Sequence, residues 1–313
     1  MSDPSIAVVL PAYNEAATIA ETLRDFHAAL PEAGLWVVDN ASSDDTARIA
    51  LETLAALGAS GGVLHEARKG KANAVRRAFL DIEADAYLMS DADSTSPAAR
   101  ARDLLAPVLA GEADMVVGDR RSQGHYDQQN KRPMHGVGNR LVQFLVNVLF
   151  HTRLTDILSG YRAFSRRFVK NYPIIVEGFE IEADLTLHAL DKRFRVLELP
   201  VEYRDRPAGS TSKLDTVRDG ARVLWMILQL FRYYRPMVFF GSLSLGMLAF
   251  GLLAGVPVFD DWIRFRYVYH VPLAVLAASS VVVATVLLAV GLILDGIAHA
   301  ERMRFEQQML RLR

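Results

Sequence analysis

The segment Ala86-Tyr87-Leu88-Met89-Ser90-Asp91-Ala92-Asp93 joins a short apolar run to two acids that are one residue apart. An apolar run of this length is typical of a buried strand. In an extended chain residues i and i+2 point the same way, so Asp91 and Asp93 are expected to face one divalent cation. Mg²⁺ or Mn²⁺ binds a few carboxylates and completes its coordination with phosphate oxygens and water. The segment therefore predicts a Mg²⁺ or Mn²⁺ site suited to a diphosphate, although an isolated Asp-x-Asp is more often a solvated turn.

Two earlier apolar runs, Ile6–Leu10 and Leu35–Val38, also end in polar clusters. These clusters are Pro11-Ala12-Tyr13-Asn14-Glu15 and Asp39-Asn40-Ala41-Ser42. Helical periodicity is found over residues 15–30, 44–57 and 70–80, and two more short strands are expected over residues 63–64 and 115–117. This β-α order predicts an α/β domain with a mostly parallel sheet and helices on both faces. Ligands bind beyond the carboxyl ends of such strands, so the three clusters are expected to share one crevice.

The composition excludes several classes of protein. The chain has 313 residues, 35 Lys+Arg against 36 Asp+Glu, and no cysteine. Without cysteine there is no disulfide framework, zinc-thiolate site or thiol nucleophile. The balanced charge offers no basic surface, so nucleic acid is not expected as a partner. No Gly-x-Gly-x-x-Gly follows the first strand, and Gly70-Lys71-Ala72-Asn73 lacks the glycine spacing of a phosphate-cradling loop.

The C-terminal third differs sharply in character. Met237–Val258 and Val271–Leu294 contain 22 and 24 residues without a charge. About 20 apolar residues are enough for a helix to cross a bilayer, so both are predicted spans; two buried helices of a large soluble core are the alternative. The linker Phe259–His270 is short, so both chain ends are expected on the same side of the membrane. More arginines flank the pair of spans than lie in the linker, so the positive-inside rule places both chain ends in the cytoplasm. The first apolar run is only strand length, so no signal peptide is expected before the domain.

These observations predict five regions. They are a cytoplasmic domain over residues 1–213, an interfacial amphipathic helix over 214–236, spans over 237–258 and 271–294, and a basic cytoplasmic tail over 295–313. Residues 139–150 are a second candidate for an interfacial helix, and an ordinary surface helix is the alternative for residues 214–234. The protein is therefore expected in the cell inner membrane, with two spans.

The polar clusters, taken in order, carry a resemblance to a known family. Val8-Val9-Leu10-Pro11-Ala12-Tyr13-Asn14-Glu15, Val37-Val38-Asp39-Asn40-Ala41-Ser42-Ser43-Asp44-Asp45-Thr46, Gly70-Lys71 and Asp91-Ala92-Asp93 resemble the family 2 glycosyltransferases of A-type fold, over roughly Ser5–Lys213. Four further motifs resemble the polyprenyl-phosphate branch, which includes dolichol-phosphate mannose synthase and bacterial undecaprenyl-phosphate glucosyltransferases. These are Gly138-Asn139-Arg140, Asp156-x-x-Ser159-Gly160-Tyr161-Arg162, Gly178-Phe179-Glu180-Ile181-Glu182 and Arg206-x-x-Gly209-x-x-Ser212-Lys213.

The resemblance implies three groups of site residues. The nucleotide would be bound by Pro11, Tyr13, Asn14, Glu15, Asp39, Lys71, Asp91, Ala92 and Asp93. Asp91 and Asp93 would hold the metal, and Arg120, Arg140, Arg206 and Lys213 would surround the acceptor phosphate. Asp91, Asp93, Arg120 and Arg206 are the expected catalytic residues. The sequence departs from the family at Asn40, where many relatives have a second acid, at Thr95, where dolichol-type enzymes carry Gln, and at Asp119, where a small residue is common.

The expected function is an inverting, metal-dependent transfer of a hexose from a nucleotide-sugar to a polyprenyl phosphate. A UDP-sugar such as UDP-glucose is favoured and GDP-mannose is the alternative donor. A lipid phosphate is already ionised at neutral pH, so it needs cations rather than a general base. Glu180, Glu182 and Asp184 keep open a hydroxyl acceptor, as in polysaccharide or glycolipid synthesis. A non-catalytic nucleotide-sugar-binding module and self-association into a homo-oligomer are also left open.

Overall fold

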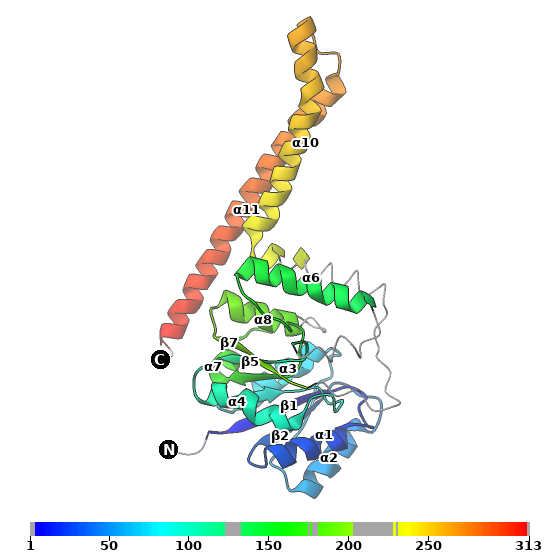
Figure 1. Cartoon of the computed structure of the whole chain (residues 1–313), viewed down its shortest axis with the longest axis vertical. Coiled ribbons are helices and arrows are strands. Elements are labelled where there is room, and N and C mark those ends of the chain that lie inside the picture. The colour runs from blue at the N-terminus through cyan, green and yellow to red at the C-terminus, as the bar shows by residue number, and fades with distance from the viewer. Residues whose placement is uncertain are drawn as a thin grey trace. The chain divides into compact units, whose positions relative to one another are not determined.

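The computed structural model describes residues 4–122, 133–174, 176, 181–202, 228–229 and 231–311, with only the backbone for 133–139. The chain divides into two units, residues 1–220 and 221–313 (Figure 1). Arg206, Lys213 and Glu180 lie outside the described residues, as does most of the predicted interfacial helix over residues 214–236.

The first unit is built on one seven-stranded sheet with the order β3-β2-β1-β4-β6-β5-β7. The strands are β1 Ile6–Ala12, β2 Gly34–Asp39, β3 Gly61–His65, β4 Ala86–Met89, β5 Met115–Asp119, β6 Arg162–Ser165 and β7 Val196–Pro200. Neighbouring strands are parallel except for β6, which lies antiparallel between β4 and β5. The mostly parallel sheet predicted from the sequence is confirmed, and β6 and β7 are additions to it.

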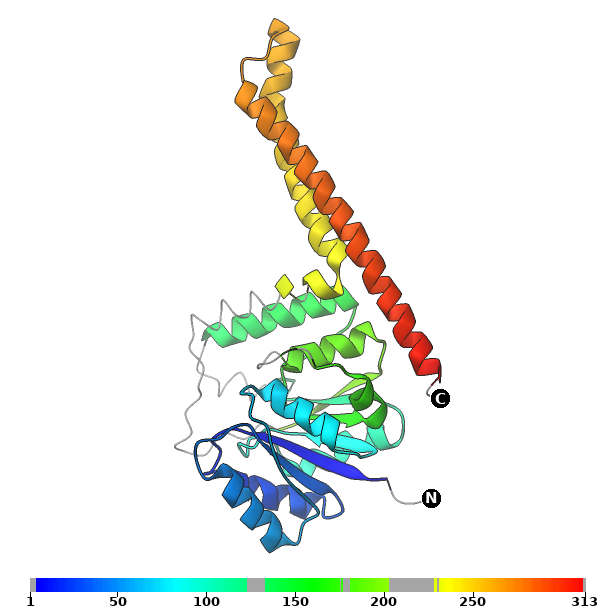
Figure 2. The ribbon, with the colours of Figure 1, turned by 180° about the vertical axis from the view of Figure 1, so that it is seen from behind.

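Helices cover both faces of this sheet (Figure 1; seen from behind in Figure 2). Their bounds are α1 Ile19–Ala29, α2 Thr46–Leu57, α3 Lys71–Asp81, η1 Ala98–Arg100, α4 Ala101–Leu109, α6 Pro133–Phe150, α7 Arg166–Asn171 and α8 Ile181–Asp191. One core joins α1, α2 and α4 to alternate residues of the strands, such as Val8, Leu10 and Leu35. This alternation follows from the period of two along each strand.

The opposite face has an aromatic core. Phe79 of α3 packs edge-on against Phe164 of β6, and Phe164 stacks on Phe168 of α7. Phe168 in turn contacts the ring of His188 of α8. Burial lowers the pKa of His188 to about 4, because the apolar surroundings disfavour the imidazolium. His188 is therefore neutral at pH 7 and serves as a packing group.

The buried imidazole predicts a specific pH dependence of stability. Between pH 6.5 and about 4 the unfolded chain binds a proton at His188 and the folded chain does not, so the free energy of unfolding falls as pH falls. From pH 7 to pH 5 this contribution is about 2 kcal/mol. We expect His188→Phe to lose that part of the pH dependence, measured by urea unfolding in detergent with circular dichroism. Equal slopes for the two proteins would contradict this account.

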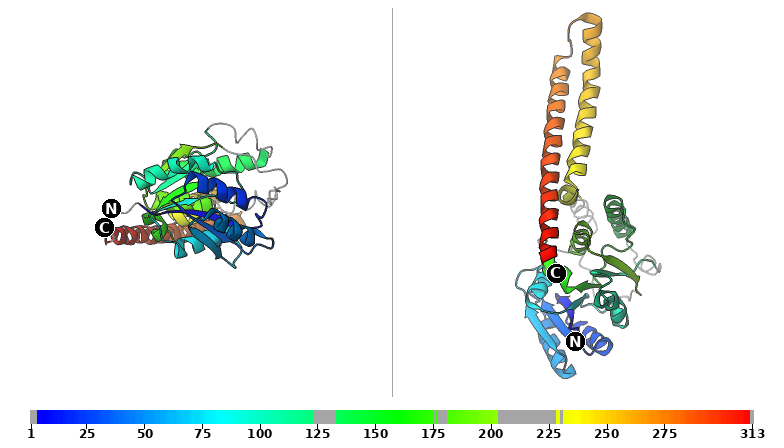
Figure 3. Two further views of the ribbon diagram at one scale, coloured as in Figure 1. Left: turned by 90° about the horizontal axis from the view of Figure 1, so that it is seen from below. Right: turned by 90° about the vertical axis from the view of Figure 1, so that its left-hand side faces the viewer.

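The second unit is a pair of long helices, α10 Pro236–Phe265 and α11 Val271–Arg311, which run side by side (Figure 3, right). Both are long and apolar enough to cross a membrane, and most of their apolar surface is exposed. Small residues allow the close approach: a Cβ on Gly251 would lie 3.0 Å from Ser280 Cβ, and one on Gly291 would lie 3.0 Å from Phe240 Cβ. Ser244 Oγ donates to the carbonyl of Ala284 at 2.7 Å.

The two helices are longer than the sequence predicted. Instead of ending near Val258, α10 continues through half of the expected linker, where Arg264 pairs with Asp260 one turn earlier. The remaining turn is closed by Asp261, whose Oδ2 accepts from the backbone of Tyr269 and His270. Similarly, α11 continues to Arg311 through the predicted tail, because a helix does not need an apolar sequence once it is nucleated.

Candidate active site

The ends of β1 and β2 are tied together by their polar clusters. Asn14 N donates to Ser42 Oγ at 3.0 Å, and Ser43 N donates to Asn14 Oδ1 at 2.8 Å. Asn14 has a φ of 54°, a left-handed conformation that Asn tolerates better than most residues. Asn14 and Glu15 therefore shape the rim of the predicted nucleotide pocket. Pro11 can occupy this central strand because the pairing of β1 with β4 ends at Val9, so its missing N–H costs no ladder bond.

Asp39 is the most unusual residue of this rim. It is the last residue of β2 and its side chain is only 1% exposed. His65 Nδ1, at the end of β3, lies 2.8 Å from Asp39 Oδ2. Within the described residues, the other oxygen, Oδ1, is buried without a hydrogen-bond partner. A buried acceptor in this state costs free energy unless a ligand supplies a donor, so Asp39 Oδ1 is suited to accept from an N–H or O–H group of a ligand.

Asn40 connects the nucleotide rim to the next helix. Its Oδ1 accepts from Gly70 N at 2.7 Å, and its Nδ2 donates to the carbonyl of Arg68 at 2.6 Å. An amide can both donate and accept, which a second acid could not do. The departure from the family pattern at this position thus has a structural function: Asn40 holds the loop that delivers Lys71 to the site. Lys69 of the same loop lies over the Tyr13 ring, with Nζ 5.6 Å from its centroid.

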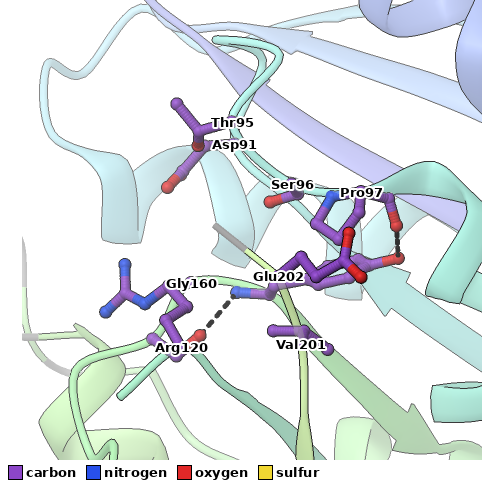
Figure 4. Close-up of a pocket in the computed structure, with 10 residues that line it drawn as sticks. Asp91, Thr95, Ser96, Pro97, Arg120, Gly160, Val201 and Glu202 are labelled. Atoms are coloured by element: carbon purple, nitrogen blue, oxygen red, sulfur yellow. Dashed lines mark hydrogen bonds between the residues drawn. The ribbon is translucent and has the colours of Figure 1, made fainter. Parts of the chain in front are cut away.

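Asp91 lines a pocket together with Thr95, Ser96, Pro97, Arg120, Ser159, Gly160, Tyr161, Val201 and Glu202. In Figure 4, Asp91 and Thr95 lie on one wall, and Arg120 and Gly160 lie across from them. Asp93 is buried beside this wall, and its Oδ1 accepts from Thr95 Oγ1 at 2.7 Å. The carbonyl of Ala92 accepts from Thr18 Oγ1 at 2.8 Å, which fastens the acidic turn, residues 91–93, to the N-terminus of α1.

The acidic turn fits a cation that is bound together with a ligand. Within the described part of the chain, no cluster of three or more His, Asp or Glu side chains could hold a metal ion by itself. The candidate metal ligands are the carboxylates of Asp91 and Asp93, and Thr95 orients the carboxylate of Asp93. Two carboxylates are the usual protein share for Mg²⁺ or Mn²⁺ where a diphosphate supplies further oxygens. The residues present therefore suit a divalent cation that arrives with a nucleotide diphosphate.

Lys71 lies against the acidic turn rather than at the nucleobase rim. Its Nζ is 2.5 Å from Asp91 Oδ1 and 2.6 Å from Glu182 Oε1, the second residue of α8. Burial lowers the pKa of Lys71, but the two carboxylates outweigh this effect and hold it above its ordinary value. A Cβ on Gly160 would lie 2.9 Å from both Lys71 Nζ and Asp91 Oδ2. A larger residue at position 160 would therefore displace one or both members of this ion pair.

Arg120 is held in place by a buried acid. Its Nε and Nη2 donate to the two oxygens of Asp156 at 2.8 and 3.1 Å, a bidentate pair. Burial raises the pKa of Asp156, but Arg120 outweighs burial and keeps it below the ordinary value. Asp119 orders the turn that follows β5 and carries Arg120, since its Oδ1 accepts from the backbone of Arg121 at 2.8 Å. Asp119, the third departure from the family pattern, therefore also has a structural role.

The other predicted residues are distributed as follows. Arg140 is exposed on α6. Of the candidate bases, Glu182 contacts Lys71, and Asp184 Oδ2 accepts from Tyr172 OH at 2.6 Å. Asp156 and Gly160 received no role from the sequence, although both belong to a motif that resembles the family. The motif Asp156-x-x-Ser159-Gly160 was the available signal, but the side chains that Asp156 and Gly160 contact, Arg120, Lys71 and Asp91, lie far away in the chain.

Comparison with known proteins places this site in a family. The family described as Glycosyl transferase family 2 matches residues 7–172. Glycosyltransferase AglJ of Haloferax volcanii is 30% identical over 303 residues, covering 96% of each chain. The undecaprenyl-phosphate mannosyltransferase of Micrococcus luteus is 30% identical over 215 residues, covering 66% of this chain and 86% of that protein.

A solved structure supports the same assignment. Glucosyl-3-phosphoglycerate synthase from Mycobacterium tuberculosis, in complex with Mn²⁺, UDP-glucose and phosphoglyceric acid, matches with a TM-score of 0.54 and 25% identity, covering 73% of this chain and 79% of that chain. The fold and site define an α/β glycosyltransferase of A-type fold. The protein belongs to glycosyl transferase family 2, as the motif resemblance predicted.

Proposed function

We propose that this glycosyltransferase moves a hexose from a nucleotide-sugar to a polyprenyl phosphate, with inversion, at the cytoplasmic face of the inner membrane. The observation that carries the proposal is the pocket in which Asp91 and Arg120 face each other (Figure 4). An acid at the donor diphosphate and an arginine at an anionic acceptor are the two charges that this transfer needs. The related undecaprenyl-phosphate mannosyltransferase supports this acceptor class.

The acceptor side is built for positioning. A lipid monophosphate is largely dianionic at neutral pH, so it attacks without a general base. Asp156 aligns the Arg120 guanidinium by a bidentate contact, which reduces the entropy that Arg120 would lose on gripping a phosphate. Arg206 and Lys213 remain predicted partners of the same phosphate, and Arg140 is a weaker candidate.

The donor side is organised by the acidic turn. A divalent cation on Asp91 and Asp93 would neutralise the leaving diphosphate. Thr95 keeps Asp93 oriented, and Lys71 contacts Asp91 before the donor binds. The phosphate oxygen forms the new bond at the anomeric carbon while the bond to the diphosphate breaks, so configuration inverts.

The buried oxygen of Asp39 favours particular nucleobases. Uracil and guanine carry a ring N–H from which Asp39 Oδ1 would accept, whereas cytosine has no ring N–H and offers only its exocyclic amino group at a different position. A UDP-sugar such as UDP-glucose is the favoured donor and GDP-mannose the alternative. We expect Asp39→Ala to raise the KM for the donor about 10- to 100-fold with little change in kcat, because a charged hydrogen bond to the base is lost. In competition assays CDP should inhibit at least about tenfold more weakly than UDP or GDP, and equal inhibition by all three would refute this subsite.

The helical hairpin supports a place in the membrane. Two candidate spans of low internal burial follow the catalytic unit, and two spans put both flanks of the hairpin on one side. Arginines are more numerous in the segments that flank the hairpin than in the linker between the spans, which supports a cytoplasmic location for the flanks. The predicted boundaries at residues 213, 236, 258, 271 and 294 are retained as part of this proposal, with the structured helices extending beyond the apolar segments.

The proposal is tested by radiolabel transfer with the purified full chain in detergent. Undecaprenyl phosphate, Mg²⁺ or Mn²⁺ and a panel of labelled UDP- and GDP-sugars are supplied, and label entering the organic phase is counted. Transfer with one donor, lost on addition of EDTA, supports the proposal and identifies the sugar. Nucleotide binding without organic-phase label from any donor would exclude a polyprenyl phosphate acceptor.

A hydroxyl acceptor is the second candidate, and one observation favours it. Glu202 lines the same pocket as Asp91 and Arg120, and a carboxylate there could remove a hydroxyl proton. The crystal structure that resembles this fold holds phosphoglyceric acid. The same assay with 3-phosphoglycerate and with neutral sugar acceptors distinguishes this case, since label would then appear in an aqueous product that is separated from the unreacted nucleotide-sugar by chromatography.

A further inference from the structure

Lys71 is in an unusual position for a lysine. It is the first residue of α3, where the positive end of the helix dipole disfavours a cation. Its side chain is only 10% exposed, so the ammonium has also lost most of its water. Lysines are almost never buried unless they are paired. Two opposing carboxylates must therefore offset these costs, and both are present.

The two carboxylates come from distant segments. Asp91 follows β4 and Glu182 begins α8, so the ammonium joins two elements that the chain separates by 91 residues. Glu182 is itself buried, with 7% of its side chain exposed, whereas Asp91 is 37% exposed and faces the pocket. The ammonium is thus held between a buried carboxylate, Glu182, and a carboxylate that faces the pocket, Asp91. Gly160 lies next to the contact, where an added Cβ would displace Asp91 or Lys71.

We propose that Lys71 is a built-in counter-cation for Asp91, which competes with the divalent cation for this carboxylate until the nucleotide diphosphate arrives. The inference rests on the proposed function, since it takes Asp91 as the metal-binding acid. Before the donor binds, the ammonium neutralises Asp91 and keeps it aimed into the pocket. A divalent cation alone meets a positive charge next to its ligand and binds weakly.

The diphosphate changes this balance. Its negative charges compensate both cations, so Lys71 can stay on Glu182 while Asp91 turns to the metal. Glu182 is therefore a positioning residue for Lys71 and has no contact with the acceptor in this account. Metal and nucleotide are expected to bind together, with little metal bound before the nucleotide.

The test measures Mn²⁺ binding directly, from the electron paramagnetic resonance signal of free Mn²⁺, with the full chain in detergent and no nucleotide. We expect Lys71→Met to bind Mn²⁺ at least about tenfold more tightly than wild type, because a positive charge beside the ligand is removed. The matched control is Lys170→Met, which removes a lysine paired with Glu83 elsewhere in the fold and should leave Mn²⁺ affinity unchanged. Unchanged or weaker Mn²⁺ binding by Lys71→Met overturns the proposal.

A second variant tests whether the result for Lys71→Met reflects a loss of folding. Lys71→Gln is neutral but can still donate a hydrogen bond to each carboxylate, and it should show the same gain in Mn²⁺ affinity. Asp91→Asn separates this inference from the proposed function. If wild type with UDP binds Mn²⁺ and Asp91→Asn does not, the assignment of Asp91 to the metal site is supported. An unaltered Mn²⁺ affinity in both Lys71 variants would then contradict only the counter-cation role of Lys71. If Asp91→Asn binds Mn²⁺ as wild type does, the metal assignment itself fails.

Discussion

Asp91→Asn is expected to lower kcat/KM for sugar transfer by about 1000-fold or more while the protein stays folded. Asp91 is the acid that faces the pocket, and the charge that develops on the leaving diphosphate has to be neutralised there. Asparagine preserves the volume of the side chain but removes its charge, so the loss of activity reports the contribution of the negative charge. Lys71 retains its contact with Glu182, which limits the effect on stability.

The measurement is initial-rate transfer at several donor concentrations, with circular dichroism to verify folding. Asp81→Asn is the matched control, because it makes the same chemical change in an exposed ion pair with Arg77 one helical turn away. The control should remain within about twofold of wild type, as is usual for a surface pair. Retention of more than a tenth of wild-type activity by Asp91→Asn would show that Asp91 does not hold the metal.

Gly160→Ala is expected to lower kcat/KM by about 100-fold through a single added methyl group. The new Cβ would lie 2.9 Å from Asp91 Oδ2 and from Lys71 Nζ, so one or both side chains must move. Both atoms are at the ends of side chains, so the fold adapts more easily than the site does. A displacement of about 1 Å in a catalytic group can cost about 100-fold in rate.

The control for this substitution is Gly62→Ala on β3, where the nearest atom to the new Cβ is Trp36 Cζ3 at an ordinary contact distance of 3.7 Å. This variant should keep wild-type activity. Thermal unfolding of Gly160→Ala should show only a small loss of stability, in contrast to the large loss of rate. A variant with full activity would mean that the contact among residues 71, 91 and 160 has no part in the reaction.

Much of the fold could be predicted from local patterns. The apolar runs at Ile6–Leu10, Leu35–Val38 and Ala86–Ser90 are all strands of the parallel part of the sheet. The strand β6 was not predicted, because its first residue is Arg162, whose side chain is fully buried. Arg162 is tolerated there since it donates to Thr186 Oγ1 and to the carbonyls of Ser159 and Ile157. Those partners are visible only after the chain has folded.

The candidate site, like the fold, could be predicted in part from local patterns. The acids Asp91 and Asp93 and the rim residues Asp39 and Asn14 could be proposed as functional because each follows a strand, and the ends of parallel strands meet at one edge. The sequence also placed Lys71 near the nucleotide, but its two carboxylate partners depend on α8, which begins 110 residues later.

Local periodicity, strand ends and apolar length thus determined from the sequence alone the α/β class, the family resemblance, the acidic turn and the two long apolar helices. Tertiary structure alone decided that Lys71 pairs with Asp91 and Glu182, that Asp156 aligns Arg120 and that Gly160 must be small. The physical reason is that hydrophobic periodicity is a property of neighbouring residues, whereas ion pairing and steric fit depend on distances between residues that are remote in the chain.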